Sequence, residues 1–363
     1  MSRLLSALSA VALFFCAALG TAAETVRLME AERIILQSAD ERAQTLALRD
    51  ALREVFVRVS GDVNAAEADG AVQEALRNPS DLLARFGFGA SEVMLPDAIG
   101  NMQPTFKLDV VFDGQRVRSA LVDSGLHVWA ARRPSVMIYL AAPNSLGNID
   151  LLGEIAQADG VALLREQARQ RGVPLQWPLL DLQDLSILTA DDVWAGFEQP
   201  MAVVAERYNA DAILGGYVGV QPDSGQWVGR WHFIFAGEKR TATFFGDTQQ
   251  SVIAQGVGLA ADAMAERYAV DHRQTARPMD ISVLNVTNVQ THGAVRQYLR
   301  DVNGISQIQM LGIDGDLARY RLSVRAPESQ LLDILALESR MQLMSDIGFG
   351  DDASALNFIW LSQ

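Results

Sequence analysis

Four histidines are the side chains of this chain best suited to acid–base chemistry or metal binding: His127, His232, His272 and His292. None of them stands in an HxH, HExxH or HxxxH arrangement, so no local metal motif is present. A general base also needs partners within hydrogen-bond reach. We therefore expect solvated histidines or histidines on strand faces, while a Ser-His-Asp triad built from distant positions stays open.

Carboxylates gather in the stretch LLDLQDLSILTADDVW. Glycoside hydrolysis would need two carboxylates with separate roles in a sugar-lined cleft. The local pattern favours a structural role, because Thr189 followed by Asp192 is a variant of the capping box and acids stabilise the first turn of a helix. We predict that Asp191 and Asp192 begin a helix. The acids of DGDLAR lack the later ligands of a calcium loop and predict a hairpin turn.

Two glycine-rich stretches could hold a phosphate. The stretch GVGLAA at 256–261 matches GxGxxA, but its surroundings place it inside a helix and not at the strand-to-helix turn that a dinucleotide needs. The stretch RYNADAILGGYVGV contains Gly215 and Gly216, and a turn into another strand follows it instead of a helix N-terminus. These two glycines predict a bulge or a close crossing in a strand. The aromatic residues expected to cover them alternate along the next strand: Trp227, Trp231, Phe233 and Phe235.

The only cysteine, Cys16, lies in the apolar run Leu4–Leu19, which follows Arg3 and precedes small residues. This layout is typical of a secretory signal peptide, residues 1–23, with cleavage expected after Ala23. A retained membrane anchor is the alternative, but the run is short for a spanning helix. Cleavage would leave no cysteine for disulfides, thiolate catalysis or metal ligation. We expect a periplasmic location and neither a cofactor nor a metal.

Acidic side chains dominate the composition: 44 Asp and Glu against 30 Lys and Arg give a formal net charge of −14. The basic residues form no run. Nucleic acids and anionic lipid surfaces derive most of their affinity for proteins from clustered positive charge, so neither is an expected partner. After the signal peptide no stretch approaches transmembrane length. The sequence predicts a soluble mature chain and does not indicate its oligomeric state.

Three segments that mix helix and strand patterns must position these side chains. Residues 24–133 predict a strand, a long helix, one or two short helices in DGAVQEALRNPSDLLARFGFG, a second strand and a further helix. Ser38 or Asp40 is expected to cap the long helix, and Gly61 suits a left-handed C-terminal stop. Its apolar stripe repeats near the 3.6-residue period: Leu48, Leu52, Val55, Phe56 and Val59.

Residues 134–272 predict two strand–helix units, a strand meander and a closing helix. VMIYLA has apolar residues on both faces, which indicates a buried central strand, and LLGEIAQADGVALLREQARQRG is expected to be helical. Residues 278–363 show the order βαββαβ, which predicts a ferredoxin-like domain, with a helix over ESQLLDILALESRMQLM. The predicted fold class is α+β or α/β, in three small mixed domains of which the last is ferredoxin-like.

Several longer stretches resemble an exported proteobacterial family, the domain of unknown function 2066. They are ALREVFVRVSGD, LDVVFDGQRVRSALVDSGLHVWAARRPSVMIYLA, ERYNADAILGGYV, WVGRWHFIF and LAADAMAERYAV. The resemblance spans most of the chain after the signal peptide. Its marker residues are Gly61, Asp113, Trp129, Arg133, Pro134, Asp211, Gly216 and Trp231. One departure is Tyr139, where the family pattern is expected to have tryptophan.

The family resemblance implies no catalytic residues, because the family has no established activity. The central segment is more loosely similar to the TolB amino-terminal domain, whose relatives contact other proteins in periplasmic assemblies, and this is a fold-level analogy. We therefore favour a non-enzymatic, periplasmic, multi-domain protein that contacts envelope proteins. The alternative is an enzyme or small-ligand binder with a site between the first two domains. This alternative would need four side chains to converge with acids of the second segment: His127, Trp129, Arg132 and Arg133.

Overall fold

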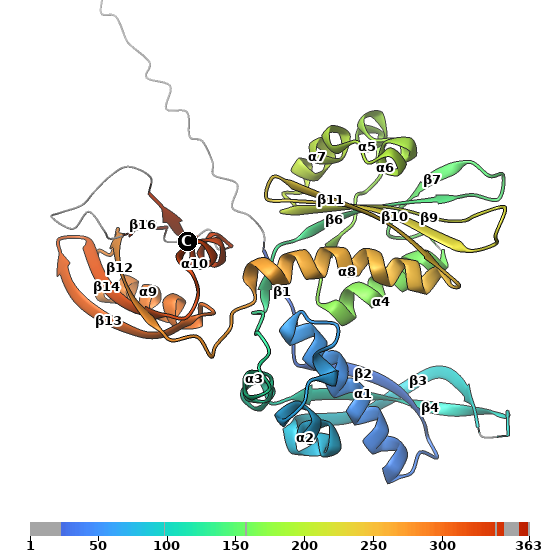
Figure 1. The fold of residues 1–363 in the computed structure, drawn as a ribbon, viewed down its shortest axis with the longest axis horizontal. Coiled ribbons are helices and arrows are strands. Elements are labelled where there is room, and N and C mark those ends of the chain that lie inside the picture. The colour runs from blue at the N-terminus through green and yellow to red at the C-terminus, as the bar shows by residue number, and fades with distance from the viewer. Residues whose placement is uncertain (1–22, 98, 157, 338–339, 345–355, 362–363) are drawn as a thin grey trace, which may run out of the picture.

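The computed structural model describes residues 23–97, 99–156, 158–337, 340–344 and 356–361. The predicted signal peptide, residues 1–23, lies outside the described residues except for its last position. Helices and strands are mixed along the chain, and the strands form three larger sheets and one two-stranded pair (Figure 1). None of the helices in the described ranges combines the length and the apolar content that crossing a membrane requires.

The first sheet is antiparallel, with strand order β2-β4-β3. Its strands and the helices around it are β2 (Glu30–Leu36), α1 (Glu41–Ser60), α2 (Ala71–Arg77), β3 (Leu83–Pro96), β4 (Met102–Phe112) and α3 (Gly114–Asp123). Asp40 caps α1 by accepting a 2.8 Å bond from the Ala43 amide, and Gly61 ends the helix at φ 79°. Both outcomes confirm the predicted helix limits, because a left-handed backbone at a helix end favours glycine.

The apolar stripe of α1 packs against one face of this sheet. Leu52, Val55, Phe56 and Val59 are fully buried there with Leu108 and Val110 of β4, and Leu48 is partly buried at the margin. The one or two short helices predicted in residues 69–89 are present as α2 and a 3-10 turn, Pro79–Leu82, whereas the end of that stretch belongs to the strand Leu83–Pro96. In that strand Phe86 and Phe88 alternate with glycines, a period-two pattern that outweighs the weak helical signal before it.

The central sheet has the order β11-β10-β9-β6-β7, and the short strand β8 also pairs with β6. The strands are β6 (Val136–Pro143), β7 (Ile149–Leu152), β8 (Leu175–Gln176), β9 (Ala212–Val220), β10 (Trp227–Phe235) and β11 (Glu238–Gly246). β6 runs parallel to β9 and is buried along most of its length, which confirms the predicted central strand. Ile149–Leu152 pairs with β6 as a strand, so the helix predicted over that segment begins only at Asp159.

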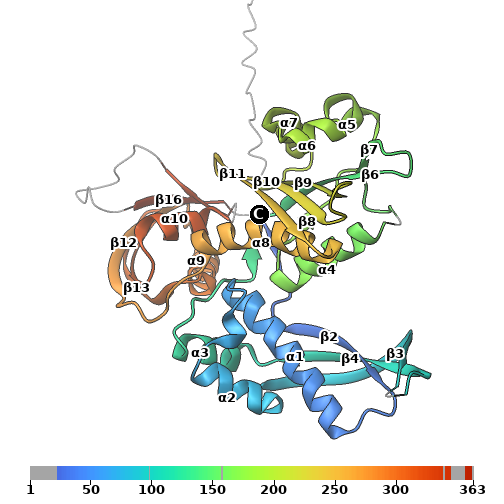
Figure 2. The same ribbon diagram turned by 45° about the vertical axis from the view of Figure 1, so that its right-hand side comes forward.

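Helices cover both faces of the central sheet (Figure 1). On one face lie α4 (Asp159–Arg171) and α8 (Gln249–Tyr268), and on the other lie α5 (Leu182–Ile187), α6 (Ala190–Ala195) and α7 (Glu198–Arg207). Helices α4 and α8 also face α1, so they lie between the central sheet and the first sheet (Figure 2). This layer is where the first two parts of the chain meet.

The last sheet has the order β13-β14-β12-β16-β15. Its elements are β12 (Arg277–Leu284), α9 (Val289–Asp301), β13 (Ile305–Asp314), β14 (Leu317–Val324), α10 (Glu328–Ala336), β15 (Met341–Leu343) and β16 (Leu356–Trp360). The predicted elements are present, but α10 is shorter and β15 is an additional strand. Because the chain makes this extra pass, β16 reaches β12 in the parallel direction. A ferredoxin-like sheet, which is antiparallel, is therefore not what these strands form.

The three larger sheets lie within the predicted segments 24–133, 134–272 and 278–363, except that β12 begins one residue earlier, at Arg277. Those domain boundaries stay a prediction, since one hydrophobic cluster includes side chains of both the central and the last sheet. A two-stranded pair, β1 (Glu24–Thr25) with β5 (Arg132–Arg133), and an isolated bridge between Val128 and Val270 also connect distant parts of the chain.

Gly216 lies directly opposite Trp231 in neighbouring strands, and the indole ring occupies the space where a side chain of residue 216 would be. On its other side the same ring contacts Gly256 of α8, and its Nε1 donates a 3.0 Å bond to the Val252 carbonyl. The predicted close crossing is therefore confirmed for Gly216. At Gly215 the covering side chain is Met201 of α7 and not an aromatic residue.

We predict that Gly216→Ala destabilises the fold by about 1–3 kcal/mol, because the added methyl overlaps the buried ring of Trp231. Urea unfolding followed by tryptophan fluorescence measures the change. Gly312→Ala in β13 is the matched control, since a Cβ there meets no atom within 4 Å. Equal stability of the two variants would contradict the proposed overlap.

Candidate functional site at the junction of the first two sheets

Arg133 is fully buried and lies face to face with Trp129, with its Cζ 3.5 Å from the centre of the indole ring. No carboxylate of the described residues forms an ion pair with it. Its guanidinium donates instead to backbone carbonyls, at 2.6 Å to Arg58, 2.8 Å to Gly172 and 3.2 Å to Arg171. These carbonyls stand at the C-terminal ends of α1 and α4, where helices carry partial negative charge and unpaired acceptors. One cation therefore caps two helices at once.

Burial lowers the pKa of the Arg133 guanidinium well below its usual value, and the positive charges of Arg58 and Arg171 act in the same direction. The close approach also requires Gly172, because a Cβ at that position would contact the guanidinium. Arg133 and Trp129 are both fully buried, and the Arg133 guanidinium is hydrogen-bonded to backbone carbonyls. Neither side chain can therefore contact a substrate.

Two more arginines connect the same helix ends reciprocally. Arg58 of α1 donates a 2.9 Å bond to the Arg169 carbonyl of α4, and Arg171 of α4 donates a 2.9 Å bond to the Gly61 carbonyl after α1. Gly61 is also tightly enclosed, because a Cβ there would contact Ala265 of α8. This explains why a glycine stands at a position that the family resemblance singled out.

A buried carboxylate, Glu54 of α1, completes the junction. It pairs with Arg33 of β2 at 2.8 Å, with Arg169 of α4 at 2.7 Å, and with Arg58. Because Arg169 belongs to the central part of the chain, these ion pairs join the first sheet to the central one. Sequence reasoning missed Glu54, since it looks like any surface acid of an amphipathic helix.

The remaining marker residues also have structural roles. Asp113 caps α3 by accepting bonds of 2.8 and 3.0 Å from the amides of Gln115 and Arg116. Asp211 accepts a 2.8 Å bond from the Ser135 amide, which aligns the starts of the parallel strands β6 and β9. Pro134 is buried between β5 and β6.

The candidate residues of the alternative function do not converge. Arg132 donates to the Leu337 carbonyl at 3.1 Å, towards the last sheet, while His127 is exposed. The side chains of Trp129 and Arg133 are fully buried. Across the described ranges of the chain, no group of three or more His, Cys, Asp or Glu side chains is placed to hold a metal ion.

The carboxylates of the second segment begin helices, as predicted. Thr189 and Asp192 form a capping box at the start of α6, and Asp191 follows in its first turn. Asp181 caps α5, and the 3.0 Å ion pair with Arg207 lowers the pKa of Asp181 to about 2. None of this resembles a pair of hydrolytic acids with separate roles.

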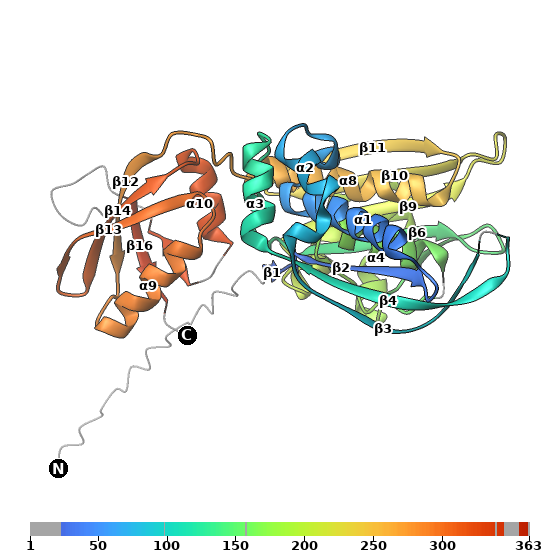
Figure 3. The same cartoon turned by 90° about the horizontal axis from the view of Figure 1, so that it is seen from below.

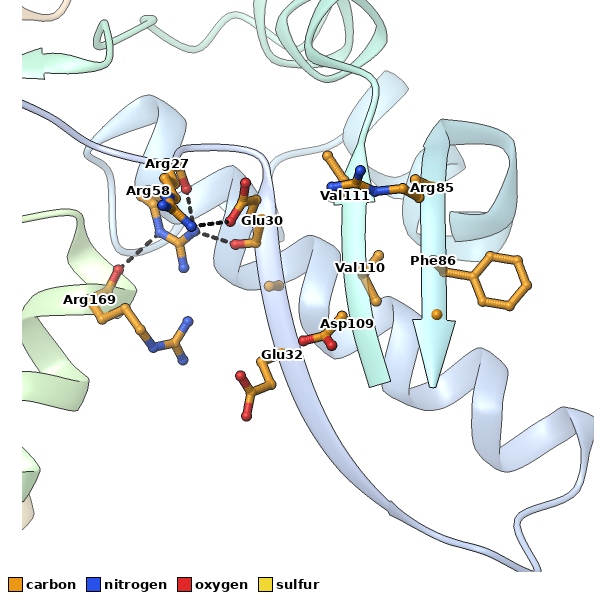
Figure 4. Close-up of a pocket in the computed structure, with 12 residues that line it drawn as sticks. Arg27, Glu30, Glu32, Arg58, Arg85, Phe86, Asp109, Val110, Val111 and Arg169 are labelled. Carbon is orange, nitrogen blue, oxygen red and sulfur yellow. Dashed lines mark hydrogen bonds and ion pairs between the residues drawn. The ribbon is translucent and has the colours of Figure 1, made fainter. Parts of the chain in front are cut away.

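A groove of about 590 Å³ opens on the outer side of the first sheet, next to this junction (Figure 4). The strands β2, β3 and β4 form it, and Arg58 and Arg169 close one end. Its lining consists of Arg27, Glu30, Ala31, Glu32, Arg58, Arg85, Phe86, Gly87, Asp109, Val110, Val111 and Arg169. This set contains charged, apolar and glycine residues but no hydroxyl, thiol or imidazole group.

Most charges of the groove are paired. Glu30 accepts from Arg27 at 3.5 Å, and Lys107 beside the groove contacts both Glu32 at 2.8 Å and Asp109 at 3.4 Å. Arg85 has no ion pair with any other described residue. The groove therefore combines carboxylates that are held in ion pairs with an arginine, Arg85, that has no ion-pair partner among the described residues.

β3 borders this groove and forms an edge of the first sheet, since its only partner among the described strands is β4 (Figure 3). Phe86 and Phe88 are 56% and 48% exposed on this edge. The opposite edge strand, β2, carries three charged side chains: Glu30, Glu32 and Arg33. Charged edges resist pairing with other chains, whereas an apolar edge invites it.

We predict that Arg133→Met lowers the free energy of unfolding by at least about 3 kcal/mol, because several buried carbonyls lose their donor. Arg133→Lys is expected to be intermediate, since an ammonium keeps the charge but not the fork of donors. Arg118→Met, an exposed arginine of α3, is the control. Chemical denaturation measures all three, and a change in Arg133→Met no larger than in the control would contradict the capping role.

His232 predicts a pH dependence of stability. It is buried, its Nδ1 lies 3.0 Å from Thr241 Oγ1, and burial lowers its pKa, assisted by Lys239 and Arg230. The unfolded chain therefore binds the proton more readily, so the contribution of His232 is complete above its unfolded pKa of about 6.5 and declines as the pH falls below that value. His232→Gln should flatten this part of the stability curve, measured by urea unfolding between neutral and mildly acidic pH. An unchanged curve would contradict the assignment.

The comparisons with known proteins extend only to the first part of the chain. A family model described as a domain of unknown function (DUF8605) matches residues 22–130. No curated protein matches the chain at the significance required, and no solved structure does so either. An uncharacterised domain thus covers the first sheet, α1 to α3 and Trp129.

Proposed function

We propose that this chain is an exported, non-enzymatic protein that binds another protein of the cell envelope through the groove of the first sheet. The observation that carries the proposal is the groove's composition. It is open and about 590 Å³ in volume, and its lining has charged and apolar side chains but no hydroxyl, thiol or imidazole. Such a surface can hold a polypeptide by charge and apolar contact. Its carboxylates are the groups that could act in catalysis, and they are held in ion pairs with Arg27 and Lys107.

Three expectations from the sequence support this proposal. The first is the predicted signal peptide, which implies a periplasmic location. The second is the resemblance to the exported family 2066, which spans most of the chain after the signal peptide. The third is the looser similarity of the central segment to the TolB amino-terminal domain, which is an analogy of fold.

The second candidate is a small-ligand binder or enzyme at the same junction. It is favoured by the position of the groove, where Arg169 of α4 faces strands of the first sheet, because pockets are common at such interfaces. The groove is not lined by any of the residues that this function would need, which are His127, Trp129, Arg132 and Arg133. We therefore rank it second.

Photo-cross-linking tests the proposed function. A benzophenone amino acid replaces Val111, which lines the groove, and in a control chain it replaces Val220, an exposed position at the end of β9. We expect one recurring envelope protein to be cross-linked from position 111 and not from position 220. With that protein purified, Val111→Arg should weaken binding at least about tenfold, and Val220→Arg should leave it unchanged.

Two results would overturn the proposal. One is the absence of any recurring protein from position 111. The other is a metabolite that raises the melting temperature of the purified chain, with the rise abolished by Val111→Arg. The second result would establish the small-ligand candidate instead.

A further inference from the structure

We propose that the free edge of β3 pairs with the same edge of a second copy of this chain, antiparallel and centred on Gly87. The pairing would join two three-stranded sheets into one six-stranded sheet, with both grooves on a continuous face. This inference rests on the proposed function and deepens it, because it specifies the surface that a partner would meet. It is carried by the exposed edge, by the symmetry of the strand and by its charges.

The outer edge of β3 has no partner strand among the described residues. From Arg85 to Ala90 each residue of β3 pairs in regular register with β4, and a register shift follows between Ala90 and Met94. The stretch 86–90 carries no charge, no proline and no bulge. Charges, prolines and bulges are the features by which proteins prevent edge-to-edge pairing of strands. The other edge strand of the sheet, β2, carries charges. An unprotected edge of this kind fits an added strand.

The aromatic side chains are symmetric about Gly87. Phe86 and Phe88 point to the same face of the sheet, as residues two apart in a strand do, and they form an edge-to-face pair with centroids 6.1 Å apart. A two-fold axis through Gly87, perpendicular to the sheet, places each Phe86 opposite Phe88 of the second copy. Directly opposed aromatic side chains are among the favourable cross-strand pairs. The same axis leaves Gly87 opposite Gly87, without a clash.

The opposite face supplies complementary charge. In this register Arg85 lies opposite Gly89 of the second copy, whose missing side chain leaves room for the guanidinium. Asp109 Oδ2 is 3.9 Å from the position that a Cβ of Gly89 would occupy. Arg85, which has no ion pair within the described part of its own chain, would therefore meet the Asp109 carboxylate across the interface. The symmetry generates two such ion pairs.

A second copy would supply both the aromatic pairs and the ion pairs from residues of β3 and its neighbour β4. An unrelated strand would have to carry the same alternation of aromatic residues and glycines together with a matching arginine. The self-complementary order Arg-Phe-Gly-Phe-Gly at 85–89 already provides it. The isologous pairing is also closed, so it yields a dimer and no filament.

Charge complementation tests the register. Arg85→Asp alone sets two carboxylates against each other at both ion pairs of a homodimer, and Asp109→Arg alone sets two guanidinium groups against each other. Mixing the two variants restores both pairs. We expect the wild-type chain to dimerise in a concentration series by sedimentation velocity, each variant to associate at least about tenfold more weakly, and the equimolar mixture to recover heterodimer. A mixture that stays as monomeric as its components would overturn the register.

Cross-linking tests the edge itself. In a Cys16→Ser background, Gly87→Cys should give a covalent dimer with a short bismaleimide at dilute protein, because the two positions face each other across the axis. Gly312→Cys is the matched control, an edge-strand glycine of β13 with equally open surroundings. Phe88→Ser added to Gly87→Cys should abolish the product. Equal yields from positions 87 and 312, or a monomeric wild-type chain at all concentrations, would overturn the dimer.

The two proposals fail separately. Phe88 does not line the groove, so Phe88→Ser leaves the groove intact while breaking the pairing. A monomeric wild-type chain that still cross-links an envelope protein from position 111 would overturn only the dimer. A dimer that cross-links no envelope protein would overturn only the proposed function.

Discussion

The arrangement of the molecule depends on a buried cation that has no counter-ion among the residues that the structure describes. Arg133 is held between the face of Trp129 and the carbonyl groups at the ends of α1 and α4. A buried charge is tolerated only when it is fully hydrogen-bonded. Here the donors of the guanidinium and the unpaired acceptors of two helix ends satisfy each other. Any shift of α1 relative to α4 would leave both sides unpaired, so this residue opposes movement of the first sheet relative to the central one.

That constraint bears on the kind of function the chain can perform. The reciprocal bonds of Arg58 and Arg171 and the ion pairs of Glu54 fix the same junction from other sides. A hinged cleft that closes over a substrate would have to break them. The groove of the first sheet needs no such movement, because it lies on an outer face beside the junction. A rigid scaffold with an open sheet is consistent with binding in which the partner adapts to the surface.

Much of the local structure could be predicted from the sequence. Asp40 and Gly61 limit α1, Thr189 caps α6, and Gly216 accommodates Trp231, because each depends on neighbours in the chain or on one bulky cross-strand side chain. What could not be predicted depends on distant pairings. The parallel direction of β16 follows from an extra strand, β15, that is only three residues long. The strand at Phe86 was missed although its alternation with glycine was visible, because a helical pattern preceded it.

The same limit applies to the candidate site. Arg133 and Trp129 were recognised as markers, but their role as a joint required knowing which helix ends they meet, and these are far apart in the chain. The acceptors are backbone carbonyls, and the only side-chain requirement at the end of α4 that this residue imposes is a glycine at 172. The joint does draw on distant parts of the chain. The carbonyl at the end of α1 takes its donor from Arg133, and the same guanidinium reaches the carbonyl of Gly172. Gly61 lies against Ala265, which is further along still, so the contacts of this one helix end are complete only when residues well into the second half of the chain are present.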